Sequence, residues 1–530
     1  MQSFRLLVFL ACFTICQSEP EPPRVRVRRL GTVLGTHETL WFNNQTVEVF
    51  RGIPFAEPPI GMRRFRETQL VEKFPYSPFN ASEYPPACIQ IYANFTQDED
   101  CLYLNIWRPA VRRTKLPVIV MIYGGAFIVG HSRSPNYSGL PLTALHDVIV
   151  VNFNYRLGAF GFSDLSEIVN LPGNQGFLDQ RLAIKWVKEF IEDFGGDPTR
   201  ITLMGCSAGA VGVSYHLKSP LSQGLVRGAV MDAGVLSTKR LETVRSSLRR
   251  MIRLAVKVGC NSTRPHQLLR CLRKVPAAVI NDASMTVMDS PLLSFRPTKF
   301  PEELLEAVSG NVSVFLGHSG SEGLTLVSNG FGINDPLPEF RSTHEAVEWC
   351  KVLLMSGLRE FEENIESQWS QFKDFLDRLY FKGYEHSLVD RAALFLGDMY
   401  FHCSMLSSYK TTPVSTFYVF ERAFKKNVFW DNDPEIYKSF HMTAHMHFVG
   451  SQLLTLRDEI HPEDLAFTLK SMEWIADFAS HSSVAGIPRT SYPAVVSIDS
   501  EIRRSKQHEA LDRCRHLKEF FKGRGLDIFE

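Results

Sequence analysis

The sequence predicts an α/β fold built on one mostly parallel sheet. Residues 117–122 and 148–153 are apolar, β-branched runs without polar alternation, as in strands that are buried on both faces of a parallel sheet. The spacing of apolar residues becomes helical over 181–194, Gly-Gly-Asp-Pro at 195–198 ends that helix, and 201–204 is a further buried strand. Strands and helices that alternate along a chain in this way indicate an α/β core.

The composition is that of an ordinary folded protein. Among 530 residues, 58 Lys and Arg balance 57 Asp and Glu, and 44% are apolar. This apolar content is too high for a disordered chain, and the near-neutral charge gives no footprint for nucleic acid or an acidic membrane surface. At ~150 residues per domain, the length alone allows three or four domains. No linker, internal repeat or low-complexity tract divides the chain, however, so we expect one domain over 19–530 with helical insertions.

Residues 1–18 have the features of a secretory signal peptide. Residues 1–5 form a short basic start, 6–16 are apolar, and Cys16-Gln17-Ser18 offers small residues for cleavage. The apolar run is too short to cross a bilayer, so an N-terminal anchor is the less favoured alternative. We expect a secreted, extracellular protein without a membrane span, with the ER lumen as the other possible location on the secretory pathway.

The cysteines and sequons agree with that route. Two of the ten cysteines lie in the signal segment, and closely spaced cysteines in a secreted chain are expected to form disulfides. The expected bridges are two short-range pairs and one long-range pair: Cys88–Cys101, Cys260–Cys271 and Cys403–Cys514. Cys206 and Cys350 remain as free thiols. The candidate N-glycosylation sites are Asn44, Asn80, Asn94, Asn136, Asn261 and Asn311.

Two charged segments have a structural interpretation and a sharper alternative. Arg and Val alternate over 24–29, which predicts an edge strand with one charged face. A proprotein-cleavage site at Arg29 is the alternative, but the alternation explains every position. Residues 241–258 have helical apolar spacing and a basic opposite face. A solvated helix face is favoured there over a membrane-surface or calmodulin-binding helix. Residues 361–380 predict a similar helix with mixed charge.

The strongest local motif is Gly-x-Ser-x-Gly at 205–209, between the strand at 201–204 and a helix predicted over 208–217. The glycines permit a tight strand-to-helix turn that exposes the hydroxyl of Ser207 above the sheet. The motif therefore predicts that Ser207 is a nucleophile. Cys206 inside it is interpreted as a packed, inert sulfur, with a reactive thiol as the alternative.

A serine nucleophile also needs donors for the oxyanion that forms. The sequence Tyr-Gly-Gly-Ala-Phe at 123–127 follows a predicted strand, where backbone N–H groups can converge without interfering side chains. We expect Gly125 and Ala126 to donate together with Ala208, the residue after the nucleophile. A nucleotide-binding turn is the rival interpretation, but the glycine spacing does not fit G-x-G-x-x-G.

Five longer segments extend the motif into a family resemblance. In chain order they are FRGIPFAEPP at 50–59, EDCLYLN at 99–105, NYRLGAFGF at 154–162, GNQGFLDQR at 173–181 and FGGDP at 194–198. They resemble the type-B carboxylesterases and cholinesterases, in order from about residue 30 to the end of the chain. The resemblance implies an α/β-hydrolase fold, with a mostly parallel central sheet and helical insertions that cap an active-site gorge. It implies no metal or cofactor.

The resemblance also places the rest of a catalytic triad. The loop after the apolar run at 312–316 matches the family's acid loop and puts the acid at Glu322, and the segment before Gly450 puts the base at His441. His445 is the alternative base. The histidines at 441, 445 and 447 also suggest zinc, but no H-E-x-x-H motif or cysteine pair supports a metal site.

Three positions depart from the family pattern. The residue before the nucleophile is usually Glu in the family and is Cys206 here, a supporting serine is replaced by Ala233, and a Glu three residues after the histidine is replaced by Ala444. These changes remove partners that orient the triad. They predict lower turnover more than they predict loss of activity.

The substrate class can be bounded in the same way. Cholinesterases carry a tryptophan for the choline cation in the loop that corresponds to 88–101, and here the aromatic residues of that loop are Tyr92 and Phe95. The acyl-side segment 289–295 is also less aromatic. We therefore expect a secreted serine carboxylesterase that takes neutral small-molecule esters rather than acetylcholine. An acyltransferase with the same triad and a non-catalytic, neuroligin-like binding protein are the alternatives.

Overall fold

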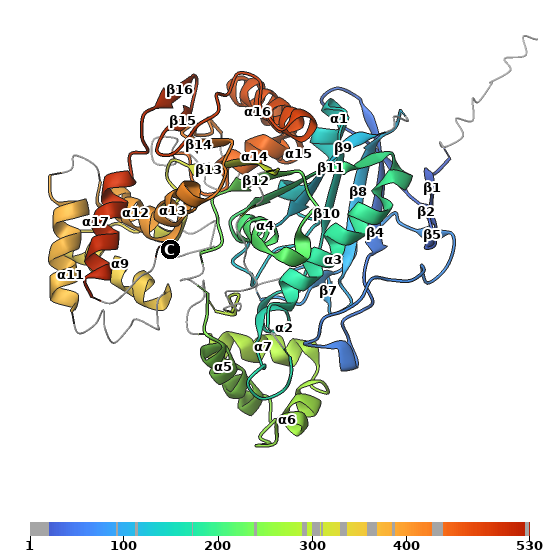
Figure 1. The fold of residues 1–530 in the computed structure, drawn as a ribbon, viewed down its shortest axis with the longest axis horizontal. Helices are drawn as coiled ribbons and strands as arrows, with labels where there is room; N and C mark the ends of the chain where they lie inside the picture. Colours follow the sequence, from blue (N-terminus) through green and yellow to red (C-terminus); the bar gives the residue numbers. More distant parts are fainter. Residues whose placement is uncertain are drawn as a thin grey trace, which may run out of the picture.

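An eleven-stranded sheet runs through the centre of the computed structural model (Figure 1). Its order is β16-β15-β14-β13-β12-β11-β9-β10-β8-β4-β3. The strands are β3 Thr36–Thr39, β4 Thr46–Pro54, β8 Tyr103–Pro109, β9 Leu116–Ile122, β10 Ile149–Phe153, β11 Gly196–Cys206, β12 Gly228–Asp232, β13 Ser313–Ser319, β14 Thr416–Phe420, β15 Val495–Ile498 and β16 Ile502–Ser505.

The structure describes most of the chain. The described residues are 21–91, 94–111, 115–171, 173–237, 241–288, 294–298, 308, 311–328, 337–357, 368–383, 387–426, 438–524 and 529. The predicted signal peptide at 1–18 lies outside them. So do Tyr92 and most of the 289–295 segment.

The middle of the sheet is parallel and its edges are antiparallel. Every neighbouring pair from β10 to β15 is parallel, whereas β8, β4, β3 and β16 join antiparallel. All residues of β9, β10 and β12 are buried, so both faces of the central strands are covered. This confirms the predicted mostly parallel α/β core, and it explains why these strands lack polar alternation.

Helices cover the sheet and extend beyond it. Helices α3 and α4 pack on each other and against β11, while α16 contacts β9 and β11. The helices are α1 Leu140–Leu145, α2 Gly158–Phe162, α3 Gln175–Phe190, α4 Ala208–Lys218, α5 Val244–Lys257, α6 Pro265–Leu272, α7 Ala277–Val287, α8 Leu324–Val327, α9 Thr343–Gly357, α11 Trp369–Leu376, α12 Leu388–Gly397, α13 Cys403–Thr411, α14 Thr443–Val449, α15 Gln452–Thr455, α16 Pro462–His481 and α17 Leu511–Lys522.

Two groups of helices project from the sheet as insertions. Helices α5, α6 and α7 follow β12 and lie together at the bottom of Figure 1, while α9, α11, α12 and α17 form a second group at the left. Helices α11 and α12 are each continued by a π-helical turn, Asp377–Phe381 and Asp398–His402. Among the described helices, none is both long and apolar enough to cross a membrane.

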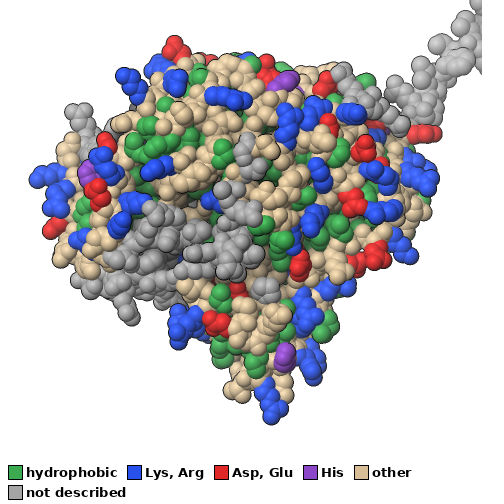
Figure 2. Space-filling view, in the orientation of Figure 1, with side chains coloured by type: hydrophobic (Ala, Val, Ile, Leu, Met, Phe, Trp, Pro, Cys, Tyr) green, Lys and Arg blue, Asp and Glu red, His purple; other side chains and the backbone are tan. Residues whose placement is uncertain are grey.

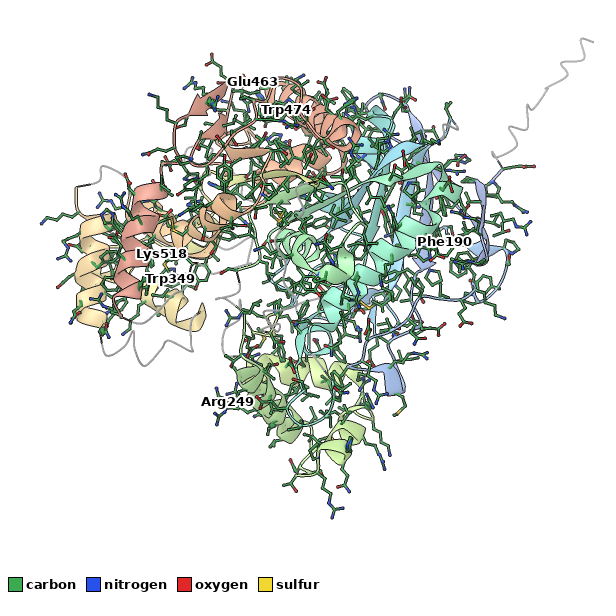
Figure 3. All side chains as sticks on the ribbon, in the orientation of Figure 1. Phe190, Arg249, Trp349, Glu463, Trp474 and Lys518 are labelled. Atoms are coloured by element: carbon green, nitrogen blue, oxygen red, sulfur yellow. A yellow bond between two sulfur atoms is a disulfide. The ribbon has the colours of Figure 1, made fainter. Side chains whose placement is uncertain are left out.

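The predicted charged segments have the expected structures. Strand β1, Arg24–Val27, buries its valines, exposes its arginines and forms the edge of a small sheet with β2 Gly31–Leu34 and β5 Phe79–Asn80. Helix α5 buries its apolar side, and Arg249 points away from the molecule (Figure 3). On the face shown in Figure 2, basic and acidic side chains are interspersed. Helix α11 and its π-helical turn occupy the later part of the helix predicted over 361–380, and 361–367 lie outside the described residues.

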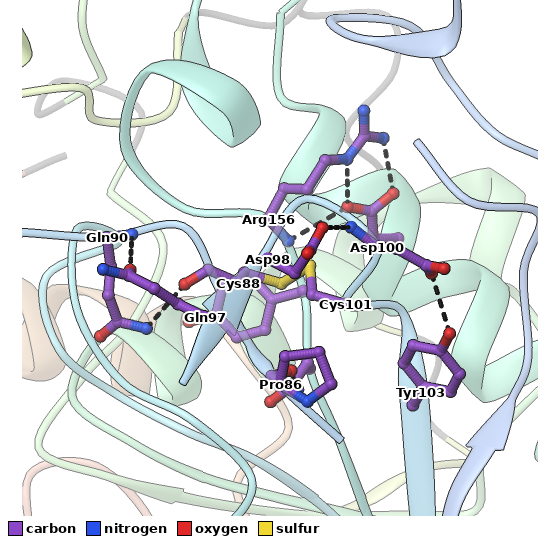
Figure 4. The surroundings of a disulfide bond; sticks show 12 residues. Pro86, Cys88, Gln90, Gln97, Asp98, Asp100, Cys101, Tyr103 and Arg156 are labelled. Carbon is purple, nitrogen blue, oxygen red and sulfur yellow. Dashed lines mark hydrogen bonds and ion pairs between the residues drawn. A yellow bond between two sulfur atoms is a disulfide. The ribbon is translucent and has the colours of Figure 1, made fainter. Parts of the chain in front are cut away.

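The cysteines are arranged as the sequence predicts. Cys88–Cys101, Cys260–Cys271 and Cys403–Cys514 form disulfides. Cys206 and Cys350 are free and buried. The first disulfide joins the ends of a loop in which β6, Ala87–Cys88, pairs with β7, Gln97–Asp98 (Figure 4).

Candidate active site

Ser207 lies at a strained turn between β11 and α4. Its backbone has φ 58° and ψ −127°, a region that residues with side chains rarely adopt. Close packing requires the flanking glycines: a Cβ on Gly209 would lie 2.1 Å from the carbonyl oxygen of Ile122, and one on Gly205 would lie 2.5 Å from Gly209. The structure thus has the strand–turn–helix arrangement that the Gly-x-Ser-x-Gly motif predicts, with the half-buried Ser207 at its apex.

Glu322 and His441 are joined beside this turn. His441 Nδ1 lies 2.5 Å from Glu322 Oε2, and the other carboxylate oxygen accepts the backbone N–H of Ser319 at 2.6 Å. The loops that carry the two residues are tied together by a hydrogen bond from Ser321 N–H to the Ser439 carbonyl. Burial by itself would lower the pKa of His441, but the Glu322 charge and hydrogen bond raise that pKa above its ordinary value.

His441 stands next to the cavity that holds Ser207. The ring of Phe401 packs on the His441 ring, with centroids 4.9 Å apart, and Phe401 lines the same cavity as Ser207. The hydrogen bonds of the described residues do not include one between Ser207 Oγ and His441. Catalytic hydrogen bonds are often long before substrate binds. The structure therefore brings the predicted acid and base together and places them near the predicted nucleophile, Ser207, without a hydrogen bond between Ser207 Oγ and His441 among the described residues.

The loop after β9 approaches Ser207 closely. Gly125 and Ala126 have φ values of 116° and 52°, and the Gly125 carbonyl accepts N–H groups from Ile128 and Val129 at 3.0 Å. Within the described residues, the N–H groups of Gly125, Ala126 and Ala208 have no hydrogen-bond acceptor. Ala126 and Ala208 line the cavity with Ser207. Unpaired N–H groups at such a place are what a developing oxyanion requires.

The cavity beside Ser207 has a volume of about 180 Å³ and mostly apolar walls. Leu241 from the segment before α5, Leu353 from α9 and Met399 from the π-helical turn after α12 supply aliphatic surface. Among the described lining residues, Arg296 is the one with a charged side chain, and none is a carboxylate. The helical insertions therefore shape the site as well as the outline of the molecule.

Comparison with known proteins accounts for this arrangement. A sequence profile described as "Carboxylesterase family" matches residues 21–513. The chain belongs to the carboxylesterase family. Its sheet and helices are accordingly those of the α/β-hydrolase fold, as the resemblance predicted.

Curated relatives of this carboxylesterase-family chain come from both branches. It is 40% identical to an acetylcholinesterase of Danio rerio over 308 residues, which is 55% of the chain and 48% of that protein. It is 35% identical to an acetylcholinesterase of Electrophorus electricus over 405 residues, 70% of the chain and 62% of that protein. It is 36% identical to carboxylesterase 1C of Rattus norvegicus over 336 residues, 58% of the chain and 59% of that protein. The matches thus span about half to three fifths of each relative's length.

The two other histidines near His441 have structural partners in this family member. His445 Nε2 donates to the Asn136 carbonyl at 2.9 Å, and burial lowers the pKa of His445 to about 4. His447 Nδ1 lies 2.8 Å from Thr468 Oγ1, and burial lowers its pKa to about 3. In the part of the chain that the structure describes, no carboxylate hydrogen-bonds to either ring as Glu322 does to His441. Within the described residues, no group of three His, Cys, Asp or Glu side chains is placed to hold a metal ion.

The disulfide loop contacts the loop after β9, which carries the predicted oxyanion donors Gly125 and Ala126, through a residue that the sequence interpretation did not single out. The buried Gln90 donates from Nε2 to the Gly130 carbonyl at 2.9 Å, and its Oε1 accepts the Gly130 N–H at 2.8 Å. Gln97 accepts the backbone N–H of Gln90 at 2.8 Å, inside the loop shown in Figure 4. Phe95 packs edge-on against His131. In this chain two hydrogen bonds therefore join the disulfide loop to Gly130, shortly after the predicted oxyanion donors Gly125 and Ala126.

Asp232 is the second residue that the sequence interpretation missed. It ends β12 and is fully buried, and its carboxylate accepts the Tyr418 hydroxyl at 2.8 Å. Burial raises the pKa of the neighbouring Cys206 thiol well above its ordinary value, and the Asp232 charge adds to that effect. Cys206 is therefore a protonated, packed thiol, in agreement with the inert interpretation. An acidic residue at the end of an apolar strand was the available signal for Asp232.

Proposed function

We propose that this protein is a serine carboxylesterase that hydrolyses neutral esters through an acyl-enzyme on Ser207. In this proposal His441 takes the Ser207 proton while the hydroxyl attacks the ester carbonyl, and Glu322 orients the imidazole and stabilises its cation. The alkoxide leaves with the proton from His441. Water then attacks the acyl-enzyme by the same route in reverse, which releases the acid and restores Ser207.

One observation carries the proposal: an apolar cavity has a strained serine at its wall and free amide groups beside it. The N–H groups of Gly125, Ala126 and Ala208 are the candidate oxyanion donors. An uncharged acyl or alkyl group can be desolvated in such a cavity at little cost, whereas a charged one would lose its hydration. Membership of the carboxylesterase family and relatives named as esterases support this chemistry.

The residues that line the cavity disfavour a choline ester. Among the described lining residues, none is a carboxylate that could pair with a choline cation. A quaternary ammonium group would therefore find neither a counter-ion in the described lining nor the tryptophan that cholinesterases carry in the loop corresponding to 88–101. Both features favour neutral esters over acetylcholine.

Active-site labelling tests the proposal. The purified protein should react with a fluorophosphonate probe, and Ser207→Ala should abolish labelling. It should also hydrolyse p-nitrophenyl butyrate faster than butyrylthiocholine. An unlabelled wild-type protein would support the non-catalytic, binding-protein alternative, and a preference for the thiocholine ester would overturn the substrate assignment. Release of p-nitrophenol with formation of a new ester instead of free butyric acid, when an alcohol is supplied, would point to acyl transfer.

We also propose that the protein is secreted and glycosylated. The three disulfides suit an oxidising compartment. Of the candidate asparagines, five are exposed and Asn136 is half-buried: Asn44, Asn80, Asn94, Asn136, Asn261 and Asn311. Expression of the full chain in a secreting eukaryotic cell should deliver to the medium a protein that lacks residues 1–18 and shrinks on treatment with a peptide N-glycosidase. Retention of an uncleaved, unglycosylated chain in the cell would contradict this.

A further inference from the structure

Four residues line up across the sheet directly beside Ser207. Cys206 on β11 pairs with Asp232 on β12, Asp232 pairs with Gly317 on β13, and Gly317 pairs with Tyr418 on β14. The Ser207 N–H donates to the Asp232 carbonyl at 2.9 Å. This row therefore lies at the carboxyl edge of the parallel strands, one residue from the nucleophile.

Within this row, the side chain of Tyr418 on β14 extends across β13 to Asp232 on β12. A Cβ on Gly317 would lie 2.3 Å from Cγ of Tyr418, so the tyrosine ring crosses β13 over bare backbone. Its hydroxyl then donates to Asp232 Oδ1 at 2.8 Å. Both side chains are fully buried. A buried carboxyl whose side-chain donors are the neutral Tyr418 hydroxyl and Cys206 thiol is a costly arrangement, which argues for a use of its charge.

The groups around Asp232 belong to the catalytic site. The Cys206 thiol comes from β11, Tyr418 from β14, and Glu322 and His441 from the two loops of the acid–base pair. The Tyr137 hydroxyl, which accepts the Gly124 N–H at 2.8 Å, lies near Cys206 and Asp232. Among these described neighbours, His441 is the group that becomes a cation during the proposed reaction, and the negative charge of Asp232 favours that cation.

We propose that Asp232 is a positioning residue of the esterase site: its carboxylate, held by Tyr418, adds a second negative charge beside the Glu322–His441 pair and stabilises the imidazolium that forms when His441 takes the proton of Ser207. The inference rests on the proposed function. Asp232 does not touch the substrate, and it acts through His441.

Asp232 gains its negative charge within the pH range in which esterase activity can be measured. Burial, and next the charge of Glu322, raise the pKa of Asp232 to about 7, while the hydrogen bond from Tyr418 lowers it. The carboxyl therefore loses its proton as the pH rises through neutrality. The rate of ester hydrolysis should increase as Asp232 ionises, in addition to the increase that comes from the deprotonation of His441.

The main test is Asp232→Asn, measured with p-nitrophenyl butyrate between pH 5 and 9. Asparagine keeps the size of the side chain and an acceptor for Tyr418 but has no charge. We expect kcat at pH 8 to fall by about tenfold, less than the 10²- to 10⁴-fold that a direct general base contributes, because Asp232 acts through His441. The KM should change by less than twofold. The acid limb of kcat/KM should move to lower pH, because His441 loses a neighbouring anion that raised its pKa.

Tyr418→Phe supplies a second, milder test. Loss of its hydroxyl should raise the pKa of Asp232, so the acid limb should move to higher pH while the rate at pH 9 stays near that of the wild type. In the Asp232→Asn background the same change should leave the profile where it is. The matched control is Tyr409→Phe, which removes a buried hydroxyl that bonds Thr490 and Ala494 rather than Asp232. It should leave the profile unmoved.

The outcomes separate this inference from the proposed function. Suppose that the wild type hydrolyses the ester through Ser207, but that Asp232→Asn and Tyr418→Phe both have the pH profile of the wild type. Asp232 then has only a structural role, and the inference is overturned. If wild type neither hydrolyses the ester nor labels at Ser207, the proposed function itself fails. Should Asp232→Asn not fold, the Tyr418→Phe profile decides alone.

Discussion

The Nε2 atoms of His318 and His508 lie 2.6 Å apart in the protein interior. His318 Nδ1 donates to the Ser319 carbonyl at 2.9 Å, and His508 Nδ1 accepts the Ala510 N–H at 2.9 Å. These partners fix both tautomers, so His508 Nε2 donates to His318 Nε2. A second proton on either ring would set two N–H groups against each other. The pair links β13, just ahead of the Glu322 loop, to the segment before α17.

This pair predicts acid-sensitive stability. Burial lowers the pKa of both histidines well below 6.5, and nearby His402 and Arg513 act in the same direction on His508. The unfolded chain therefore binds more protons, and stability falls as the pH drops below about 6.5. At pH 5, each histidine that stays neutral in the folded state should lower the free energy of unfolding by about 2 kcal/mol, compared with its value well above pH 6.5. Thermal unfolding of wild type at pH 5, 6 and 7 should show the fall.

His508→Gln tests the assignment to this pair. The variant should be less stable at pH 7 but should lose less on going to pH 5, because one depressed group is gone and His318 gains a neutral neighbour. His461→Gln is the control, since that exposed histidine makes only a local helix-cap contact at the start of α16. An unchanged slope of Tm against pH in His508→Gln would contradict the prediction.

The Glu322–His441 contact predicts the acid limb of the activity profile. In the proposed mechanism His441 must be neutral to accept the Ser207 proton, and its pKa lies above 6.5 because the charge and hydrogen bond of Glu322, with the charge of Asp232, together outweigh burial. The kcat/KM for a neutral ester should therefore rise with pH through a midpoint above 6.5. Glu322→Gln should lower kcat by about 10³- to 10⁴-fold. An acid limb well below pH 6 in the wild type would show that His441 is not the base.

The buried thiols predict a protein that resists alkylation. Burial raises the pKa of Cys206 well above its ordinary value and also raises that of Cys350, and the thiolate is the reactive form. Iodoacetamide at pH 8 should leave the folded protein active and unmodified. After denaturation without reductant, mass spectrometry should find two added groups. Rapid modification of Cys206 with loss of activity would instead establish a reactive thiol at the nucleophile turn.

The sequence predicted what local patterns determine. Continuous apolar runs located β9 and β10 to within a residue or two, since burial on both faces leaves no room for polar alternation. Strand β11 is longer than the predicted 201–204. Its polar first residues also lie beside β9, where Gly196 pairs with Leu116 before a shift in register. The resemblance of two loops to the family pattern predicted that Glu322 and His441 form a pair, although 119 residues separate them.

Partnerships that depend on register could not be predicted in this way. Asp232 and Tyr418 are 186 residues apart and meet only because β13 presents Gly317 between them. His318 and His508 are 190 residues apart, in segments with no shared motif. An isolated polar residue in an apolar context indicates that a partner exists, but the sheet order decides which partner it is.

The amide pair between Gln90 and Gly130 predicts that the disulfide loop supports the oxyanion segment. Gln90→Ala removes both bonds to Gly130, and each is worth about 1 kcal/mol when intact. We expect kcat for p-nitrophenyl butyrate to fall about threefold to tenfold with little change in KM, because a looser segment aims the Ala126 N–H less well at the oxyanion. Gln97→Ala is the matched control, since it removes a bond within the disulfide loop and leaves Gly130 untouched. Equal losses in the two variants would mean that the loop affects only folding, whereas a selective loss of kcat in Gln90→Ala would establish the support.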